Sequence, residues 1–219
     1  MPDLTKQKWR SKIEAKLLDS GAEDSHRIYG ERKQEAIGAM SGTVVELGPG
    51  TGVNMRYYAS GVKVIAIEPN PVMHDPLRAK ADEHGVDLEI RTLRGESIDV
   101  EDASVDGVVG TLLLCGVDDP AQVVREAHRI LKPGGTYFFV EHVESPDGHR
   151  NRTVQKVLVR PHRWMFNGCE ITRNTASLLE AGPFESIEVT EVDRGRAALW
   201  VRHQIIGEAV KADCGKSSK

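Results

Sequence analysis

Several features that mark other protein classes are missing from this 219-residue chain. No window reaches the ~18 consecutive apolar residues that a membrane span needs, and the charged stretch 1–21 lacks the apolar core of a signal peptide. The net charge of −4 gives no basic footprint for nucleic acid. These absences predict a cytoplasmic protein with no membrane span and no nucleic-acid partner.

Cysteine is also scarce. Cys115, Cys169 and Cys214 lie far apart and form no CxxC pair, and the eight histidines form no HExxH pair. The sequence therefore predicts neither a disulfide framework nor a metal site. Two basic clusters, at 149–152 and 160–163, are expected to lie in solvated loops, with a local positive patch as the alternative.

From Thr43 onward, strand and helix patterns alternate along the chain, which predicts a mainly parallel, doubly wound α/β sheet. Two later apolar runs with only four residues between them predict an antiparallel hairpin at the end of the sheet. Strands are expected at 43–47, 62–67, 86–92, 105–114, 136–142, 187–192 and 197–206. Helices are expected at 53–59, 73–84, 120–131 and 172–179, the last capped by Thr172.

This α/β domain is expected to span residues 41–210. Residues 1–40 show a helical pattern interrupted by Gly21 and Gly30, which predicts two short helices covering the site. Residues 211–219 are polar and are expected to form a flexible tail. A monomer and a homodimer are both compatible with a chain of this length.

The turn after the first predicted strand reads Gly48-Pro49-Gly50-Thr51-Gly52. Glu68 follows 20 residues beyond Gly48, which is the spacing of a carboxylate that accepts hydrogen bonds from ribose hydroxyls. The third glycine falls one residue short of the dinucleotide fingerprint GxGxxG, and no Gly-Lys-Ser/Thr follows to form a phosphate loop. The turn therefore predicts a nucleoside-containing ligand that is neither of these two kinds.

Four motifs occur in order along this part of the chain: 46–52, Glu68, 105–109 (VDGVV) and 131–135 (LKPGG). In combination they resemble the class I S-adenosylmethionine-dependent methyltransferases. The resemblance implies a Rossmann-like seven-stranded sheet, S-adenosyl-L-methionine as cofactor and S-adenosyl-L-homocysteine as product.

A narrower resemblance involves the segments 68–71 (EPNP), 111–115 (TLLLC), 141–143 (EHV) and 166–173 (FNGCEITR). They are similar to segments of the small-molecule thiol S-methyltransferases, which implies direct SN2 transfer of a methyl group to a thiol or reduced dithiol. One alternative is an O-, C- or N-methyltransferase acting on a quinone-like or lipid headgroup substrate. Another is a protein that binds the cofactor without turnover.

The class I resemblance implies a set of cofactor-binding residues at the carboxyl ends of the strands. Glu46 is expected near the amino acid end of the cofactor, with capping of a local turn as the alternative. Glu96 and Ser97 are expected to flank the adenine, and Thr111 to back the methionine portion. The full expected set is Glu46, Gly48, Gly50, Gly52, Glu68, Pro69, Asn70, Gly95, Glu96, Ser97, Thr111 and Leu112.

His142 ends the fifth predicted strand and is the candidate for accepting the proton that the substrate loses. Its alternative role is a hydrogen bond to the scaffold. The candidate substrate-binding residues are Cys115, His162, Trp164 and Phe166. For the cysteines, the alternative is a role as small buried hydrophobes.

Overall fold

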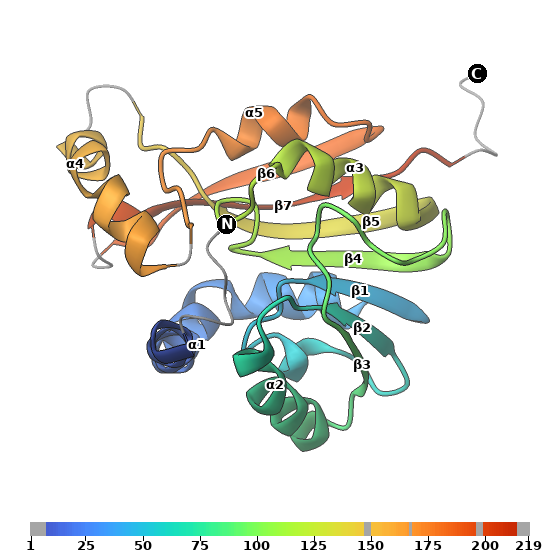
Figure 1. Cartoon of the computed structure of the whole chain (residues 1–219). Helices are drawn as coiled ribbons and strands as arrows, with labels where there is room; N and C mark the ends of the chain where they lie inside the picture. Colours follow the sequence, from blue (N-terminus) through green and yellow to red (C-terminus); the bar gives the residue numbers. More distant parts are fainter. Residues whose placement is uncertain (1–7, 147–149, 167, 196–198, 214–219) are drawn as a thin grey trace.

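The computed structural model describes residues 8–146, 150–166, 168–195 and 199–213, and within these ranges seven strands form one mixed sheet. The strand order is β3-β2-β1-β4-β5-β7-β6 (Figure 1). Strands β1 to β5 are parallel, and β7 is antiparallel to both β5 and β6. This confirms the predicted doubly wound sheet with its antiparallel hairpin. The strands are β1 Thr43–Leu47, β2 Lys63–Ile67, β3 Asp87–Arg91, β4 Val105–Thr111, β5 Leu131–His142, β6 Ser186–Asp193 and β7 His203–Val210.

Helices cover both faces of the sheet (Figure 1). Successive strand residues point to opposite faces, so Val44 packs with Ile37 of α1 and Leu77 of α2, while Val45 packs with Val123 of α3. The helices are α1 Lys8–Gly38, α2 Pro71–His84, α3 Pro120–Ile130, α4 Arg150–Met165 and α5 Thr175–Glu180, with short 3-10 helices η1 Met55–Tyr57 and η2 Leu199–Val201. Among the described residues, no helix has the length and hydropathy that crossing a bilayer would require.

The amino-terminal segment differs from the expected pair of short helices. It forms one continuous helix, α1, that runs through Gly21 and Gly30. A glycine inside a helix costs only about 1 kcal/mol relative to alanine. The burial of Tyr29 and Ile37 against the sheet offsets that cost.

The expected helix at 53–59 is also wrong, because only the single turn η1 forms there. The chain does not continue as a helix on either side of η1, because specific polar contacts hold the flanking residues. Asn54 hydrogen-bonds to Lys33 and Glu46, and Tyr58 turns to an extended conformation and donates its hydroxyl hydrogen to Glu46.

The last third contains two further corrections. The basic clusters expected in loops lie mostly in α4, with residue 149 outside the described part. Helix α5 begins at Thr175, because Asn174 rather than Thr172 accepts the capping hydrogen bond, from the N–H of Ser177 at 3.2 Å. The helical turn η2 precedes β7, which therefore starts at His203 instead of at residue 197.

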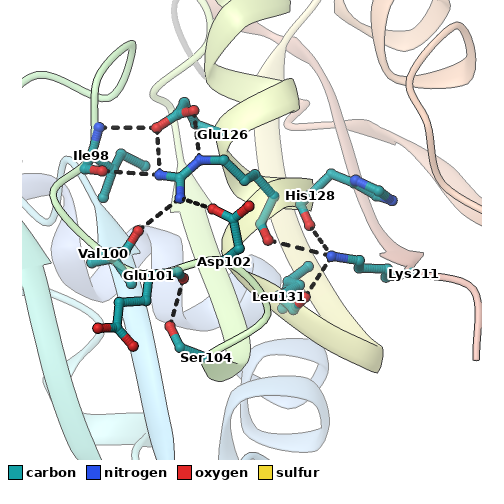
Figure 2. Close-up of polar contacts among 10 residues, drawn as sticks. Ile98, Val100, Glu101, Asp102, Ser104, Glu126, His128, Leu131 and Lys211 are labelled. Carbon is teal, nitrogen blue, oxygen red and sulfur yellow. Dashed lines mark hydrogen bonds and ion pairs between the residues drawn. The ribbon is translucent and has the colours of Figure 1, made fainter.

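Arg129, near the end of α3, fixes the chain between β3 and β4. Its guanidinium donates hydrogen bonds of 2.6–2.9 Å to the carboxylates of Glu126 and Asp102 and to the carbonyl oxygens of Ile98 and Val100. Figure 2 shows these acceptors, which lie in α3 and in the chain between β3 and β4, pointing toward one another. The loop that carries residues 95–97 is thereby tied to α3.

Lys211, at the start of the expected flexible tail, is anchored. Its ammonium group donates to the carbonyl oxygens of His128 and Leu131 at 2.8 and 2.7 Å (Figure 2). The ordered domain thus continues past the expected boundary at residue 210.

Candidate functional site

The glycine turn between β1 and η1 has its backbone in the left-handed region that favours glycine. The φ angles are +61° at Gly48, +57° at Gly50 and +83° at Gly52. A Cβ atom added to Gly50 would lie 3.2 Å from Cδ1 of Leu18. Helix α1 therefore lies directly against the turn.

A polar contact also ties α1 to α2 beside this turn. The ammonium of Lys80 in α2 donates to the carboxylate of Asp19 in α1 at 2.5 Å and lies 3.5 Å from the hydroxyl of Thr51. The middle of α1 is thus held next to the glycine turn from two directions.

Glu68 follows β2 and joins it to the glycine turn. Its Oε2 accepts a hydrogen bond from the N–H of Gly50 at 3.0 Å, and its Oε1 accepts one from the N–H of Asn70 at 2.8 Å. The side chain is buried, and burial raises the pKa of the Glu68 carboxyl to about 7. An ionised carboxylate accepts about four hydrogen bonds, so both oxygens keep acceptor capacity for a ligand.

Glu46 lies under the turn, fully buried at the end of β1. It accepts hydrogen bonds of 2.8 Å from the side chains of Asn54 and Tyr58. Asn54 in turn accepts a 2.8 Å hydrogen bond from Lys33, whose pKa burial lowers to about 8. Burial raises the pKa of Glu46. These contacts tie Glu46 to the chain that follows the glycine turn.

Three other predicted cofactor residues have contacts of their own. Asn70, which follows Pro69, caps α2 through a 3.2 Å hydrogen bond that its side chain accepts from the N–H of Val72. Glu96 accepts a 3.0 Å hydrogen bond from the N–H of Asp118. The N–H of Ser97 donates to the carbonyl of Arg94 at 3.1 Å, within the loop that also contains Gly95.

The carboxyl end of β4 faces the same turn. Thr111 accepts a 3.0 Å hydrogen bond from the side chain of Asn54, which also contacts Glu46 under the turn. The next residue, Leu112, has a φ of +56° and is 38% exposed. A branched residue in this conformation is strained, and such strain gathers at functional sites. The N–H of Leu112 donates to the carbonyl of Val140 at 2.7 Å, which holds it in place.

Glu141, the neighbour of His142 in β5, organises the chain after Leu112. Its carboxyl group accepts hydrogen bonds from the N–H groups of Leu113, Leu114 and Cys115 at 2.9, 2.7 and 3.3 Å. The side chain is fully buried, and burial raises its pKa to about 8. Glu141 therefore fixes where Cys115 lies relative to His142.

Two cysteines and a histidine meet at this end of β4 and β5. The Sγ atoms of Cys115 and Cys169 are 3.2 Å apart, and Nδ1 of His142 lies 3.6 and 3.7 Å from them. The contact with Cys169 raises the pKa of the Cys115 thiol, aided by burial. The contacts from Cys115 and from His142 lower the pKa of the Cys169 thiol. Cysteines far apart in the sequence are thus neighbours in the fold.

The predicted substrate residues of α4 and the following turn divide into two groups. The rings of His162 and Phe166 lie 4.4 Å apart, and Phe166 packs against the cluster that contains Cys115 and Cys169. Trp164 points elsewhere. It is 56% exposed, and its ring lies 6.5 Å from that of Trp9 in α1.

The residues around the glycine turn fit S-adenosylmethionine on two observations. The left-handed glycines carry no side chains, so a ligand can approach the backbone of the turn, and the buried carboxylate of Glu68 stands beside Gly50 with free acceptor capacity. When bound, this cofactor supplies a methyl group on a sulfonium sulfur, which a nucleophile takes by in-line displacement.

Comparisons with known proteins agree with this fit. Residues 45–139 match the model of the family described as "Methyltransferase domain". Thiol S-methyltransferase TMT1B of Rattus norvegicus is 37% identical over 172 residues, which are 77% of this chain and 70% of the relative. Thiol S-methyltransferase TMT1A of Homo sapiens is 35% identical over the same shares of the two chains. The chain belongs to the class I S-adenosylmethionine-dependent methyltransferases.

Solved structures show the same fold for this methyltransferase. A Thermotoga maritima S-adenosylmethionine-dependent methyltransferase, described as a possible histamine N-methyltransferase, superposes with a TM-score of 0.63 at 19% identity. The match covers 92% of this chain and 99% of the other. The family confirms the cofactor predicted from the sequence, S-adenosyl-L-methionine.

Sequence reasoning missed four residues of this methyltransferase's site: Lys33, Asn54, Tyr58 and Glu141. Glu141 belongs to the quoted segment 141–143, and an acid inside an otherwise apolar strand was the available signal. The other three carried no local signal, because their roles arise from contacts with Glu46.

Proposed function

We propose that this methyltransferase methylates the sulfur of a small-molecule thiol or reduced dithiol. The observation that carries the proposal is the similarity to two thiol S-methyltransferases over 77% of the chain. The position of His142 supports it, because its imidazole lies at the carboxyl edge of β5, paired in register with Gln204 of β7 and close to Cys115. Ligands of open α/β sheets bind at that edge.

We assign the roles of the cofactor-binding residues from their contacts around the turn. Glu68 accepts the ribose hydroxyls, and the backbone of the glycine turn approaches the cofactor. Glu46 acts indirectly, by holding Asn54 against Thr111. The loop at 95–97 borders the adenine, with Arg129 keeping that loop in place.

A thiol needs little activation compared with an alcohol or an amine. With a pKa of about 8.5, a few per cent of a free thiol is thiolate at pH 7, and thiolate is a strong nucleophile. The protein therefore has to position the sulfur, exclude water and promote loss of one proton. We assign the last task to His142, and the apolar wall of the acceptor site to Phe166.

The test is product detection with labelled S-adenosylmethionine and three matched acceptors: benzyl mercaptan, benzyl alcohol and benzylamine. We expect a methyl thioether from the thiol and no product from the other two. Methylation of the alcohol or the amine alone would replace the thiol reading with one of the alternative acceptor classes. Cofactor binding without any product would favour a binding protein without turnover.

His142 is tested within the same assay. His142→Ala is expected to lower kcat with benzyl mercaptan while leaving the Kd for S-adenosylmethionine unchanged. His84→Ala, at an exposed position at the end of α2, is the matched control and should leave both unchanged. Equal turnover of the His142 variant and wild type across pH 6–9 would remove His142 from the reaction.

A further inference from the structure

The side chains of Cys115, Cys169 and His142 converge at the carboxyl ends of β4 and β5 in a way that thiol burial alone does not require. Their three ligand-type atoms all lie within 4.8 Å of one another, and all three residues are buried. Each comes from a different segment: the chain after β4, the turn after α4 and the end of β5. We propose that these three residues bind a Zn²⁺ ion whose fourth coordination position takes the thiolate of the acceptor.

The distances match a tetrahedral zinc site. Zinc binds thiolate sulfur at about 2.3 Å and imidazole nitrogen at about 2.0–2.1 Å, so tetrahedral edges are about 3.6 Å from sulfur to nitrogen and about 3.8 Å between sulfurs. The observed distances from Nδ1 of His142 to the two Sγ atoms are 3.6 and 3.7 Å. The two Sγ atoms, 3.2 Å apart, need to separate by only about 0.6 Å.

A disulfide explains the cluster less well. It needs the two sulfurs at about 2.05 Å, and it gives no role to an imidazole nitrogen that lies nearly equidistant from both. Two thiolates and one imidazole form a soft, mixed S₂N donor set that suits zinc. With both thiols ionised, the complex of Zn²⁺ with these ligands is neutral, which favours its burial.

The backbone holds the three ligands in place without a metal. The carbonyl of Cys115 accepts a 2.7 Å hydrogen bond from the N–H of Glu170, the residue next to Cys169. The hydroxyl of Thr175 donates to the carbonyl of His142 at 3.3 Å, and Glu141 accepts the N–H of Cys115. A site assembled in this way loses little entropy when the ion binds.

His162 indicates why the fourth position stays open. Its Nδ1 accepts a 3.2 Å hydrogen bond from the indole N–H of Trp200, and an indole can only donate. The neutral ring therefore carries its proton on Nε2, so that atom cannot bind a metal. This Nε2 is buried and has no hydrogen-bond partner among the described residues. The ring also lies 4.4 Å from that of Phe166, which packs against the cluster that contains Cys115 and Cys169.

Zinc with three protein ligands and one exchangeable position is the arrangement of catalytic rather than structural sites. An acceptor thiol that binds there loses its proton to solvent and its sulfur becomes a zinc-bound thiolate, with no change in oxidation state. This part of the proposal rests on the thiol acceptor proposed above, whereas the zinc site itself does not. In the zinc-bound site, His142 promotes loss of the proton through the metal it holds.

The first experiment measures metal content and coordination without any turnover. The full chain, expressed with zinc and dialysed, is expected to contain about one zinc per chain. Cys169→Ser and His142→Gln should each lose it, whereas Cys214→Ser and His84→Gln should retain it. His162→Ala should retain the ion, because the Nε2 atom of that ring carries the hydrogen and has no lone pair for a metal. Wild-type protein without stoichiometric zinc, with another metal, or with a Cys115–Cys169 disulfide found by mass spectrometry would overturn the site.

The second experiment tests the open position in the cobalt-substituted protein without S-adenosylmethionine. Two thiolate ligands should give sulfur-to-cobalt charge-transfer bands, and benzyl mercaptan should shift the d–d bands and intensify the charge transfer. Benzyl alcohol should do neither. A cobalt spectrum indifferent to the thiol would overturn the open position. Thiol methylation at the wild-type rate by zinc-free protein would overturn the catalytic zinc and leave the proposed function standing. Thiol binding to the metal with no methylated product would overturn the proposed function and leave the metal site standing.

Discussion

The Oε2 atom of Glu68 accepts a hydrogen bond from the backbone N–H of Gly50 at 3.0 Å. One contact thus joins the end of β2 to the glycine turn after β1, the two features that the sequence places 20 residues apart when counted from Gly48. The spacing predicts this contact because β1 and β2 are parallel neighbours, paired from Thr43 with Lys63 to Leu47 with Ile67. Their carboxyl ends therefore meet at one edge.

Replacing Glu68 with alanine is expected to weaken S-adenosylmethionine binding by about 10- to 100-fold. Hydrogen bonds to a charged group contribute about 1.5–3 kcal/mol each, and every 1.4 kcal/mol is tenfold in affinity. Isothermal titration calorimetry measures the Kd directly. Glu188→Ala, at an exposed position in β6, is the control and should match wild type. Unchanged affinity in the Glu68 variant would undo the ribose assignment.

The raised pKa of Glu68 predicts that cofactor affinity depends on pH. Ribose hydroxyls donate to the carboxylate, so the ionised form binds, and below its pKa of about 7 the group must first release a proton. We expect the Kd to fall by up to tenfold per pH unit as pH rises from 5.5 to 7. Glu68→Gln should abolish this slope. The window stops there because α-amino groups such as that of the cofactor titrate at about 7.7–8.0. A wild-type Kd that stays constant over this range would contradict the prediction.

The sheet could be predicted from the sequence because its signals are local. Five apolar runs, with helical patterns in three of the four gaps between them, specify parallel strands, and the four-residue gap near Arg194 specifies the hairpin. The same local reasoning failed for α1, where Gly21 and Gly30 indicate a break. Burial of Ile37 against the sheet, a tertiary contact, decides that segment instead.

The site could be predicted only where its residues follow strand ends. Glu68 is such a residue: it follows the second strand, and in the fold it accepts the N–H of Gly50 in the turn after the first. Lys33 is not, because it acts through Asn54, 21 residues away. The spacing of Cys115 and Cys169 predicts no shared metal site, yet their Sγ atoms, 54 positions apart in the sequence, lie 3.2 Å from each other. No local sequence pattern predicts that two residues so far apart in the chain are neighbours in the fold.

Two glycine substitutions distinguish the effect of a new Cβ atom on the packing of α1 from the effect of backbone strain. Gly50 and Gly61 have φ angles of +57° and +86°, so alanine costs about 1–2 kcal/mol of folding stability at either position. A Cβ on Gly50 would meet Leu18 of α1 at 3.2 Å, whereas nothing lies within 4 Å of one on Gly61. We expect both variants to have a lower melting temperature than wild type. Only Gly50→Ala should bind S-adenosylmethionine less tightly.

Thermal unfolding and calorimetry on the two variants check this pair. If Gly61→Ala weakens binding as much as Gly50→Ala does, strain rather than access to the turn explains the effect. The double variant Gly50→Ala with Leu18→Ala gives a second check, since removing the Leu18 side chain relieves its contact with the new Cβ. Helix α1 should then pack against the turn again, and part of the affinity should return.

Glu141 makes the stability of the folded chain depend on pH with a defined sign. Burial raises its pKa to about 8 in the folded state, whereas a glutamate in the unfolded chain titrates near 4.3. Between these values the folded state holds a proton that the unfolded state has lost, so the free energy of unfolding falls as pH rises. The raised pKa of Glu68 adds a slope of the same sign that ends near pH 7. Glu46, whose pKa burial also raises, and Cys169, whose pKa is lowered, contribute as well, so the share of Glu141 is the difference between wild type and a Glu141 variant.

Glu141→Gln is expected to flatten the pH dependence of stability between pH 7 and 8. The amide oxygen of glutamine can still accept the N–H groups of Leu113 and Leu114, which share one carboxyl oxygen in the wild type. The contact with Cys115 is lost, which costs about 1 kcal/mol at pH 6. Urea unfolding of wild type and variant at pH 6, 7 and 8 measures both effects. A variant that keeps the wild-type slope above pH 7 would show that another group carries it.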